Sequence, residues 1–171
     1  MFCFNHIYAR KFINNDSLAV LTNIKANQKY LREWLGFVDK YKTIQDAESF
    51  ITSCISGYKD NSSFTLGIFD GEKHIGTFGL NSIKNNKAEI GYWIIGEYSG
   101  RGIMKNMLQQ LISYANINLG ITSFFASIAI DNIKSINLIK KLYFVTDGRI
   151  LYYEENLYGL FFDHMIYTYD Y

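Results

Sequence analysis

The stretch from residue 87 to residue 104 constrains the fold of this chain more than any other part of its sequence. Residues 88–95 are apolar, aromatic and β-branched, which predicts a strand. Glycines at positions 96, 100 and 102 end that strand, and from residue 103 onward the apolar residues recur along one helical face. That face carries Ile103, Met107, Leu108, Leu111, Ile112 and Ala115. The segment is therefore predicted to run from a strand, through a glycine-rich turn, into a helix.

The predicted turn has the properties of an anion-binding site. The first backbone N–H groups of a helix have no acceptor within the helix, and the helix dipole adds partial positive charge there. Gly100 and Gly102 carry no Cβ, so a ligand can approach the backbone closely, and Arg101 adds a cation. A phosphate or pyrophosphate is the expected guest. Glycines are also common in ordinary turns before helices, so the spacing alone leaves both interpretations open.

The residues around this turn resemble a known motif. Glu89-Ile-Gly-Tyr-Trp-Ile, followed by Tyr98-Ser-Gly-Arg-Gly-Ile-Met104, is similar to the acetyl-CoA-binding core of the GCN5-related N-acetyltransferases, or GNAT family. It most resembles the subgroup that acetylates the N-terminal serine of a ribosomal stalk protein. The family has Gln or Arg where Glu97 stands, and we expect this acidic side chain to point to solvent. The resemblance implies that acetyl-CoA contacts Trp93, Ile94, Ile95, Tyr98, Gly100, Arg101, Gly102, Ile103, Met104, Asn132 and Ser135.

A second motif follows at residues 131–144. It resembles the family's Asn-x-x-Ser-x-x-Leu-x-x-Lys-x-Gly-Phe helix, with Tyr143 in place of the usual glycine. By this resemblance Asn132 binds the pantetheine amides, and Ser135 donates a proton to the thiolate that leaves when an amine attacks the thioester. Taken alone, such residues are more often a helix cap and a hydroxyl on the helix surface. The occurrence of both motifs in order favours the binding and catalytic roles.

The rest of the chain is predicted to be ordered throughout. Strands are expected at residues 6–12, 63–69, 73–81, 122–130 and 162–169, with Asp70-Gly71 as a hairpin turn and Asn85-Asn86 as a second turn. Helices are expected from Asp16 or Ser17 onward, around residues 30–35, and from a capping-type start at 43–46 to about residue 57. The helix after the glycine-rich turn is expected to reach about residue 118 and to stop at Gly120.

These elements predict one α+β domain spanning residues 1–171. The resemblance implies the GNAT acyl-CoA N-acyltransferase fold, a mixed and mostly antiparallel sheet of six or seven strands flanked by about four helices. Strand 122–130 follows a helix and can lie parallel to strand 88–95 through a right-handed crossover. The resemblance further implies that these two parallel strands part at their ends and admit a pantetheine arm.

Two regions are candidates for the amine acceptor. Residues 31–39 resemble the acceptor side of the same subgroup and offer Trp34 and Phe37, although plain core packing explains these rings as well. The subgroup also carries a glutamate, near the aromatic C-terminal part, that takes the proton of the amine. Matching Gly159 and Asp163 points to Glu155, whereas ungapped counting from the serine of the second motif points to its neighbour, and both are equally explained as solvated loop charges. The remaining candidates for this base are Glu154 and Glu89.

Composition argues against several other classes of protein. Hydrophobic residues make up 49% of the chain, so disorder is not expected, and a net charge of +1 argues against direct nucleic-acid binding through strong positive charge. No apolar run approaches the roughly 20 residues of a membrane span, and the N-terminus lacks signal-peptide features, so a cytoplasmic protein is expected. Cys3, Cys54 and the three histidines show no metal-ligand spacing, so no metal is expected.

The expected reaction is acetyl transfer from acetyl-CoA to a primary amine by direct attack. An acyl-enzyme is not expected because neither cysteine lies near a motif. The first candidate acceptor is the N-terminal α-amine of a protein such as a ribosomal protein, and the second is a small amine such as a polyamine, amino acid, antibiotic or toxin. A non-enzymatic module that binds CoA or a dinucleotide is the third reading, and a homodimer is left open.

Overall fold

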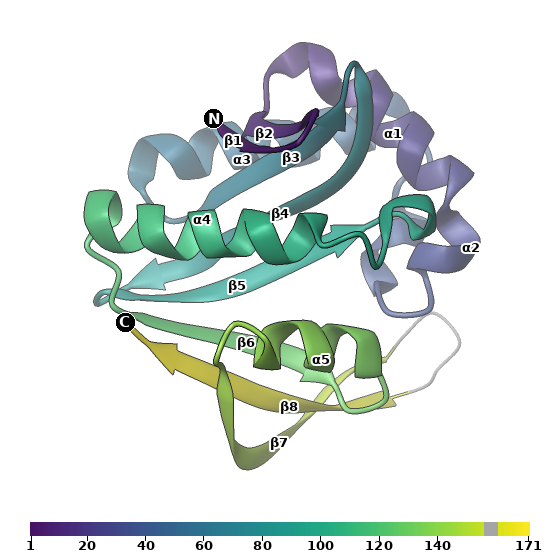
Figure 1. Ribbon diagram of the computed structural model, residues 1–171. Helices are drawn as coiled ribbons and strands as arrows, with labels where there is room; N and C mark the ends of the chain where they lie inside the picture. The colour runs from purple at the N-terminus through teal and green to yellow at the C-terminus, as the bar shows by residue number, and fades with distance from the viewer. Residues whose placement is uncertain (156–160) are drawn as a thin grey trace.

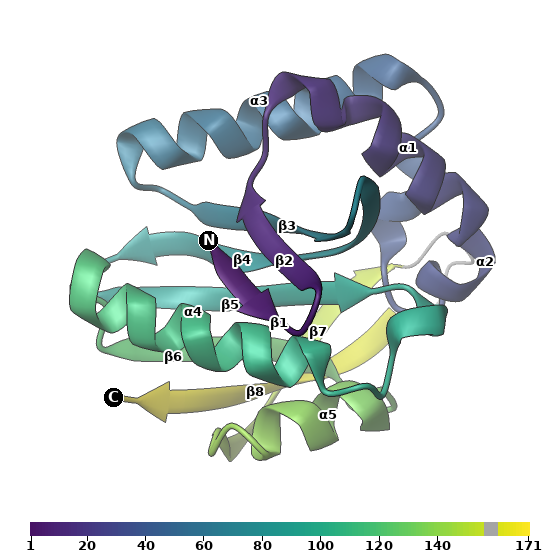
Figure 2. The same ribbon diagram turned by 45° about the horizontal axis from the view of Figure 1, so that its top comes forward.

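The computed structural model describes the backbone of residues 1–155 and 161–171, and the side chains of residues 1–149 and 163–171. These residues form one eight-stranded sheet with helices on both faces (Figures 1 and 2). The strands are β1 (Phe2–Phe4), β2 (Ile7–Lys11), β3 (Phe64–Asp70), β4 (Lys73–Lys84), β5 (Lys87–Ile94), β6 (Ser123–Ala129), β7 (Val145–Glu155) and β8 (Phe161–Asp170). The helices are α1 (Ser17–Ala26), α2 (Gln28–Leu31), α3 (Ile44–Asp60), α4 (Ile103–Leu119) and α5 (Ile133–Lys140), with short 3-10 turns η1 (Asn14–Asp16), η2 (Gly36–Lys40) and η3 (Gly96–Tyr98).

The strands lie in the order β1-β2-β3-β4-β5-β6-β8-β7. Among the described strands, β5 and β6 are the one parallel pair, and all other neighbours are antiparallel. A parallel pair needs a crossover connection, and α4 supplies it between β5 and β6. The predicted antiparallel meander, the parallel crossover and the mixed α+β sheet are therefore confirmed.

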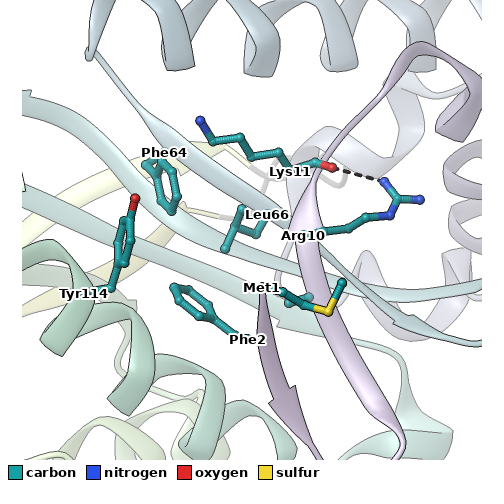
Figure 3. Close-up of a pocket in the computed structure, with 8 residues that line it drawn as sticks. Met1, Phe2, Arg10, Lys11, Phe64, Leu66 and Tyr114 are labelled. Carbon is teal, nitrogen blue, oxygen red and sulfur yellow. Dashed lines mark hydrogen bonds between the residues drawn. The ribbon is translucent and has the colours of Figure 1, made fainter. Parts of the chain in front are cut away.

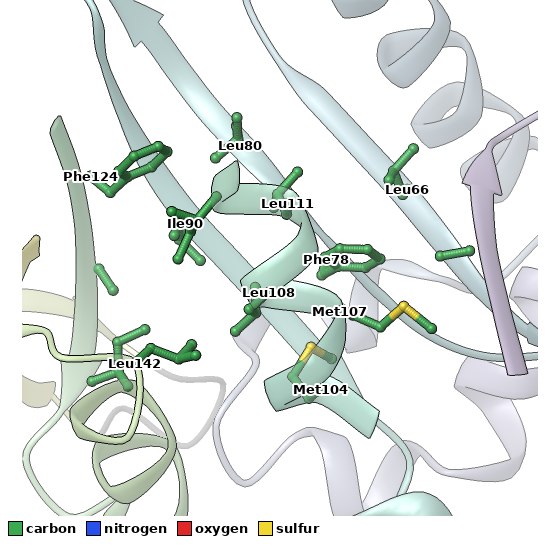
Figure 4. Packing of buried hydrophobic residues seen from close by; sticks show 14 of the residues in the cluster. Leu66, Phe78, Leu80, Ile90, Met104, Met107, Leu108, Leu111, Phe124 and Leu142 are labelled. Atoms are coloured by element: carbon green, nitrogen blue, oxygen red, sulfur yellow. The ribbon is translucent and has the colours of Figure 1, made fainter. Parts of the chain in front are cut away.

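Two apolar cores hold the helices against the sheet. Helices α4 and α5 pack on one face, where Met107, Leu108 and Leu111 of α4 meet Phe78 and Ile90 of the sheet (Figure 4). Helices α1, α2 and α3 cover the other face with a separate cluster of buried side chains. Fully burying a large apolar side chain stabilises a fold by about 1.5–3 kcal/mol, so α4 is anchored firmly along its length. Its N-terminus is thereby fixed relative to β5.

The local turns form for the reasons that the sequence suggests. Gly71 at the β3–β4 hairpin has a φ of 56°, and Asn85 and Asn86 between β4 and β5 have φ values of 51° and 58°. Glycine and asparagine tolerate this left-handed region better than other residues. The backbone N–H of Thr43 donates to an Asp46 carboxylate oxygen at 2.7 Å and caps α3 as predicted. No helix in the described part of the chain is long and apolar enough to cross a membrane.

Three details differ from the sequence-based expectation. The sheet has eight strands rather than six or seven, because β1 and β7 were not predicted, and there are five α-helices rather than about four. The run Thr146-Asp-Gly-Arg has the composition of a turn, but in the structure it lies within β7, where the register with β8 shifts between Thr146 and Ile150. The helix expected around residues 30–35 is also shorter, since α2 ends at Leu31.

Candidate active site

The two parallel strands β5 and β6 stop pairing near their middle and diverge. Their register runs from Lys87↔Ser123 to Glu89↔Phe125 and stops there, although β5 continues to Ile94 and β6 to Ala129. Figure 1 shows the two strands diverging toward their carboxyl ends. Beyond the last pair, β5 is hydrogen-bonded only to β4 among the described strands, and β6 only to β8. Residues 90–94 of β5 therefore face the gap with backbone groups free of a β6 partner, as the resemblance implied.

The glycine-rich loop at the end of β5 has the backbone shape of an anion-binding site, and we call it the anion cradle. Gly100 and Gly102 have φ values of 77° and 79°, a region that strongly favours glycine. A Cβ built at Gly100 meets nothing within 4 Å, and one at Gly102 meets only a carbon of Phe4 at 3.9 Å. The first helical hydrogen bond of α4 runs from the N–H of Asn106 to the carbonyl of Gly102. The backbone N–H groups of residues 103–105 therefore have no helical acceptor, and they lie at the positive end of a 17-residue helix.

The loop is held in place from beneath by Tyr98. Its hydroxyl donates to a carboxylate oxygen of Asp70 at 2.7 Å, and its side chain is only 7% exposed. The guanidinium carbon of Arg101 lies 5.2 Å from the centre of the Tyr98 ring, and the Lys73 ammonium lies at the same distance. Among the described residues Arg101 has no carboxylate partner, whereas Lys73 pairs with Glu97 at 2.8 Å. The positive charge of Arg101 therefore remains free to meet an anion.

Several residues predicted to contact the cofactor have side chains that are buried in the core. The side chains of Ile95, Ile103 and Met104 are buried in the core, at 1%, 4% and 6% exposure. The N–H of Ile95 is already used, since it donates to the carbonyl of Ile75. Glu97 is exposed, and the expectation that it points to solvent is confirmed. These features match a phosphate site made mainly of amide groups, in which side-chain identity matters less than backbone shape.

Helix α5 brings the second motif to the other wall of the gap. Asn132 caps this helix, because its side-chain oxygen accepts the backbone N–H of Ser135 at 3.1 Å. The Ser135 hydroxyl oxygen lies 2.7 Å from the hydroxyl of Tyr92 on β5. The cap role of Asn132 is thus established, and its contact with pantetheine stays a prediction. Tyr92 was not singled out from the sequence, because only the fold brings β5 and α5 together.

The other face of the sheet, on the side of α1–α3, carries a different set of polar groups near the gap. Side chains alternate along β5, so Glu89 and Trp93 face the side of α1–α3, whereas Tyr92 faces α5. Burial raises the pKa of the Glu89 carboxyl above its usual value. On the same face, the Ser127 hydroxyl lies 3.1 Å from Nδ1 of His164, across the β6–β8 pair. This serine–histidine pair was missed, because strand pairing between distant segments is not readable from one sequence.

The remaining candidates are the residues predicted to lie near the amine acceptor. Trp34 follows α2 and Phe37 lies in η2, and both are half-buried. Phe37 packs against the buried cluster on the face of the sheet away from α4. Phe37 packs with Tyr41 at a ring distance of 6.0 Å. Glu154 and Glu155 lie at the end of β7 rather than in a loop, which corrects that part of the expectation. Their side chains and Gly159 lie outside the described residues.

A separate hollow of about 200 Å³ lies between β1, β2, β3 and α4 (Figure 3). Phe64, Leu66 and Tyr114 form its apolar wall, and Lys11 lies at its edge with its ammonium above the Phe64 ring. None of its lining residues belongs to the glycine-rich loop, α5 or the paired ends of β5 and β6. Within the described residues, no group of three or more His, Cys, Asp or Glu side chains could hold a metal ion.

The chain is similar to several known proteins. The family model described as "Acetyltransferase (GNAT) domain" matches residues 6–145. The putative ribosomal N-acetyltransferase YdaF of Bacillus subtilis is 29% identical over 147 residues, which cover 84% of this chain and 80% of the relative. A structure of RimL, a ribosomal L7/L12 α-N-protein acetyltransferase in complex with CoA, superposes with a TM-score of 0.89 at 22% identity and covers 96% of this chain and 93% of that one. The microcin C7 self-immunity acetyltransferase MccE, in complex with acetyl-CoA and AMP, also gives a TM-score of 0.89, at 24% identity over 96% of this chain and 92% of that one.

Proposed function

Because this chain belongs to the GNAT acetyltransferase family, we propose that it acetylates the N-terminal α-amine of a protein, such as a ribosomal protein. The chain is an acetyl-CoA-dependent N-acetyltransferase, and the proposal concerns its acceptor and the roles of its residues. Similarity to YdaF along most of both chains supports a protein acceptor. One observation carries the assignment of the site: strands β5 and β6 diverge. The anion cradle lies at one end of the gap between them, and Ser135 lies beside that gap. We further infer that residues 1–171 act as one catalytic domain.

The residues present fit acetyl-CoA in two places. Gly100 and Gly102 leave space where a Cβ would stand, and the free amides of residues 103–105 can donate to the pyrophosphate, with Arg101 adding charge. The backbone of residues 90–94 lacks a β6 partner, so its N–H and C=O groups can bind the amides of the pantetheine arm as a neighbouring strand would. Asn132 keeps its side-chain nitrogen for a further amide contact, since its oxygen is used in the cap.

The chemistry needs one proton acceptor and one proton donor. The amine nitrogen forms a bond to the acetyl carbon, the carbon–sulfur bond breaks, and its electron pair leaves on sulfur. The amine loses a proton to a base, and the sulfur gains a proton from Ser135 as general acid. A covalent route through cysteine is disfavoured, because Cys54 is 4% exposed and its burial raises the pKa of its thiol to about 12. Cys3 lies on β1, where its backbone is hydrogen-bonded to the side chain of Gln110 on α4, and β1 does not border the gap between β5 and β6.

The base is assigned by comparing three glutamine variants. We propose Glu155, so Glu155→Gln is expected to remove most of the acid limb of kcat/KM against pH and to slow the reaction at neutral pH. A carboxylate accepts a proton only when ionised, so the rate falls as the pH drops through the pKa of the base. Glu154→Gln should have much less effect, and Glu89→Gln should mainly disturb folding or cofactor alignment.

The pH–rate profiles of these variants decide the matter. Glu89 has the raised pKa that suits a base, so it is the alternative on β5. If Glu155→Gln keeps the wild-type profile and Glu89→Gln loses its acid limb, the base lies on β5 and the assignment of Glu155 is wrong. If all three profiles stay unchanged, the assignment is equally wrong and the proton leaves through water.

The acceptor is tested by a screen that records CoA thiol release in the presence of acetyl-CoA. The panel contains peptides with the N-terminal sequences of ribosomal proteins, the same peptides with blocked N-termini, and small amines such as polyamines, amino acids and aminoglycosides. We expect release with the free N-terminal peptides and none with the blocked ones. Selective release with a small amine would overturn the protein-acceptor proposal while leaving the acetyltransferase activity in place.

A further inference from the structure

One hydrogen bond joins the two walls of the gap. Tyr92 lies on β5 beyond the last residue that pairs with β6, and Ser135 lies on α5, which follows β6 in the chain. Their hydroxyl oxygens are 2.7 Å apart, although the residues are 43 positions apart in sequence. The bond therefore spans the two elements that diverge, on the face of the sheet that carries α4 and α5. The proposed function does not use the Tyr92 side chain.

The geometry around Ser135 fixes its backbone on two sides. Its N–H donates to the side chain of Asn132 at 3.1 Å, and its carbonyl is a second acceptor for the Tyr92 hydroxyl at 3.3 Å, longer than the 2.7 Å to the serine oxygen. What remains free to turn is the serine hydroxyl, whose hydrogen rotates to suit its partners. The direction of that hydrogen depends on whether Tyr92 donates to the serine oxygen or accepts from it. A serine that donates to Tyr92 has no hydrogen left for a leaving sulfur.

The distances favour one direction for the bond, because the single hydrogen of Tyr92 has the Ser135 hydroxyl oxygen at 2.7 Å as its nearer acceptor and the Ser135 carbonyl at 3.3 Å as its farther one. Removal from water raises the pKa of Tyr92 to about 12, and the hydrogen bond to Ser135 only partly offsets this effect. Tyr92 therefore keeps its proton at neutral pH and has one hydrogen to donate. A phenol is a stronger hydrogen-bond donor than an aliphatic hydroxyl, and a hydroxyl that accepts such a bond becomes a better donor itself.

We propose that Tyr92 is a positioning residue for Ser135, donating its phenolic hydrogen to the serine oxygen so that the serine hydrogen points into the gap. The inference rests on the proposed role of Ser135 as proton donor to the sulfur. In the reaction the electron pair of the broken carbon–sulfur bond stays on sulfur, and the Ser135 hydrogen moves to that sulfur. Tyr92 keeps its own proton and stabilises the negative charge that develops on the serine oxygen. Solvent then returns to Ser135 the proton that the amine released.

The test is a double-mutant cycle of Tyr92→Phe and Ser135→Ala, measured in single turnovers where acetyl transfer limits the rate. Tyr92→Phe is expected to slow transfer about 10- to 100-fold, the usual effect of losing a hydrogen bond to a charged group. The apparent constant for acetyl-CoA should stay within about twofold of wild type, because the substitution leaves unchanged the β5 backbone that is proposed to bind the pantetheine arm. In the Ser135→Ala background the same substitution should have no further effect.

The matched control is Tyr58→Phe. Tyr58 also has a partly buried hydroxyl with backbone partners, accepting from the N–H of Phe12 at 3.2 Å and donating to the carbonyl of Thr65, but it lies on α3. This control should lower the melting temperature and leave turnover unchanged. Full turnover in Tyr92→Phe with slow turnover in Ser135→Ala would overturn the inference alone. An equal loss from Tyr92→Phe in both backgrounds would also overturn it, because the effect would then be structural. Full turnover in Ser135→Ala would remove both the proposed acid and the role of Tyr92.

Discussion

Gly102→Val is expected to lower the affinity for acetyl-CoA about 100-fold while the protein remains folded. The substitution places a β-branched side chain in the open space above the loop, where the pyrophosphate is proposed to lie. It also disfavours the left-handed backbone of Gly102, whose φ is 79°. Losing about two charge-assisted hydrogen bonds from the amides of residues 103–105, at about 1.5 kcal/mol each, accounts for the expected change.

Calorimetric titration with acetyl-CoA measures this effect, and Gly120→Val is its matched control. Gly120 ends the same helix with a φ of 66°, and a Cβ there also meets nothing within 4 Å. Both variants carry a backbone strain of about 1–2 kcal/mol, but only Gly102 lies at the end of α4 where the amides are free. Gly120→Val should therefore lose stability and keep its affinity. Unchanged affinity in folded Gly102→Val would contradict the assignment of the loop.

The glycine-rich loop was predictable because its determinants are local. A strand-forming run, three glycines and an apolar helical face lie within a short stretch, and each acts through its own neighbours. The turns at Gly71 and Asn85-Asn86 and the cap of α3 were predictable for the same reason. The parting of β5 and β6 was not derivable in this way, since a register that stops at Glu89↔Phe125 depends on how β6 pairs with β8. Only the family resemblance implied it.

The missed features all depend on contacts between distant segments. Strand β7 was overlooked because its Asp147-Gly148 has the composition of a turn, and its pairing with β8 makes it a strand despite a shifted register. The pairing of β6 with β8 brings Ser127 and His164 together. The crossover through α4 to β6, followed by α5, brings Tyr92 and Ser135 together. Tyr92 stands in the motif before the glycine-rich loop, but nothing in its sequence position points to Ser135.

Ser135→Ala is expected to slow acetyl transfer by about 10²–10⁴-fold, with a much smaller change in the apparent constant for acetyl-CoA. The fold should tolerate the change well, because the cap of α5 uses the backbone N–H of Ser135 and not its hydroxyl. The Tyr92 hydroxyl also retains an acceptor within reach, the carbonyl of Ser135 at 3.3 Å. The substitution therefore removes the proposed proton donor and little else, so a loss of rate can be attributed to chemistry.

Single-turnover kinetics and thermal melting separate these contributions, with Ser49→Ala as the control. Ser49 lies within α3, and its hydroxyl donates to the carbonyl of Gln45 at 2.7 Å, so its loss tests the effect of removing a helix serine away from the gap. The control should match wild type in rate. Full turnover of Ser135→Ala, with transfer limiting the rate, would show that the serine hydroxyl is only a neighbour of the helix cap and that the sulfur leaves without a protein donor.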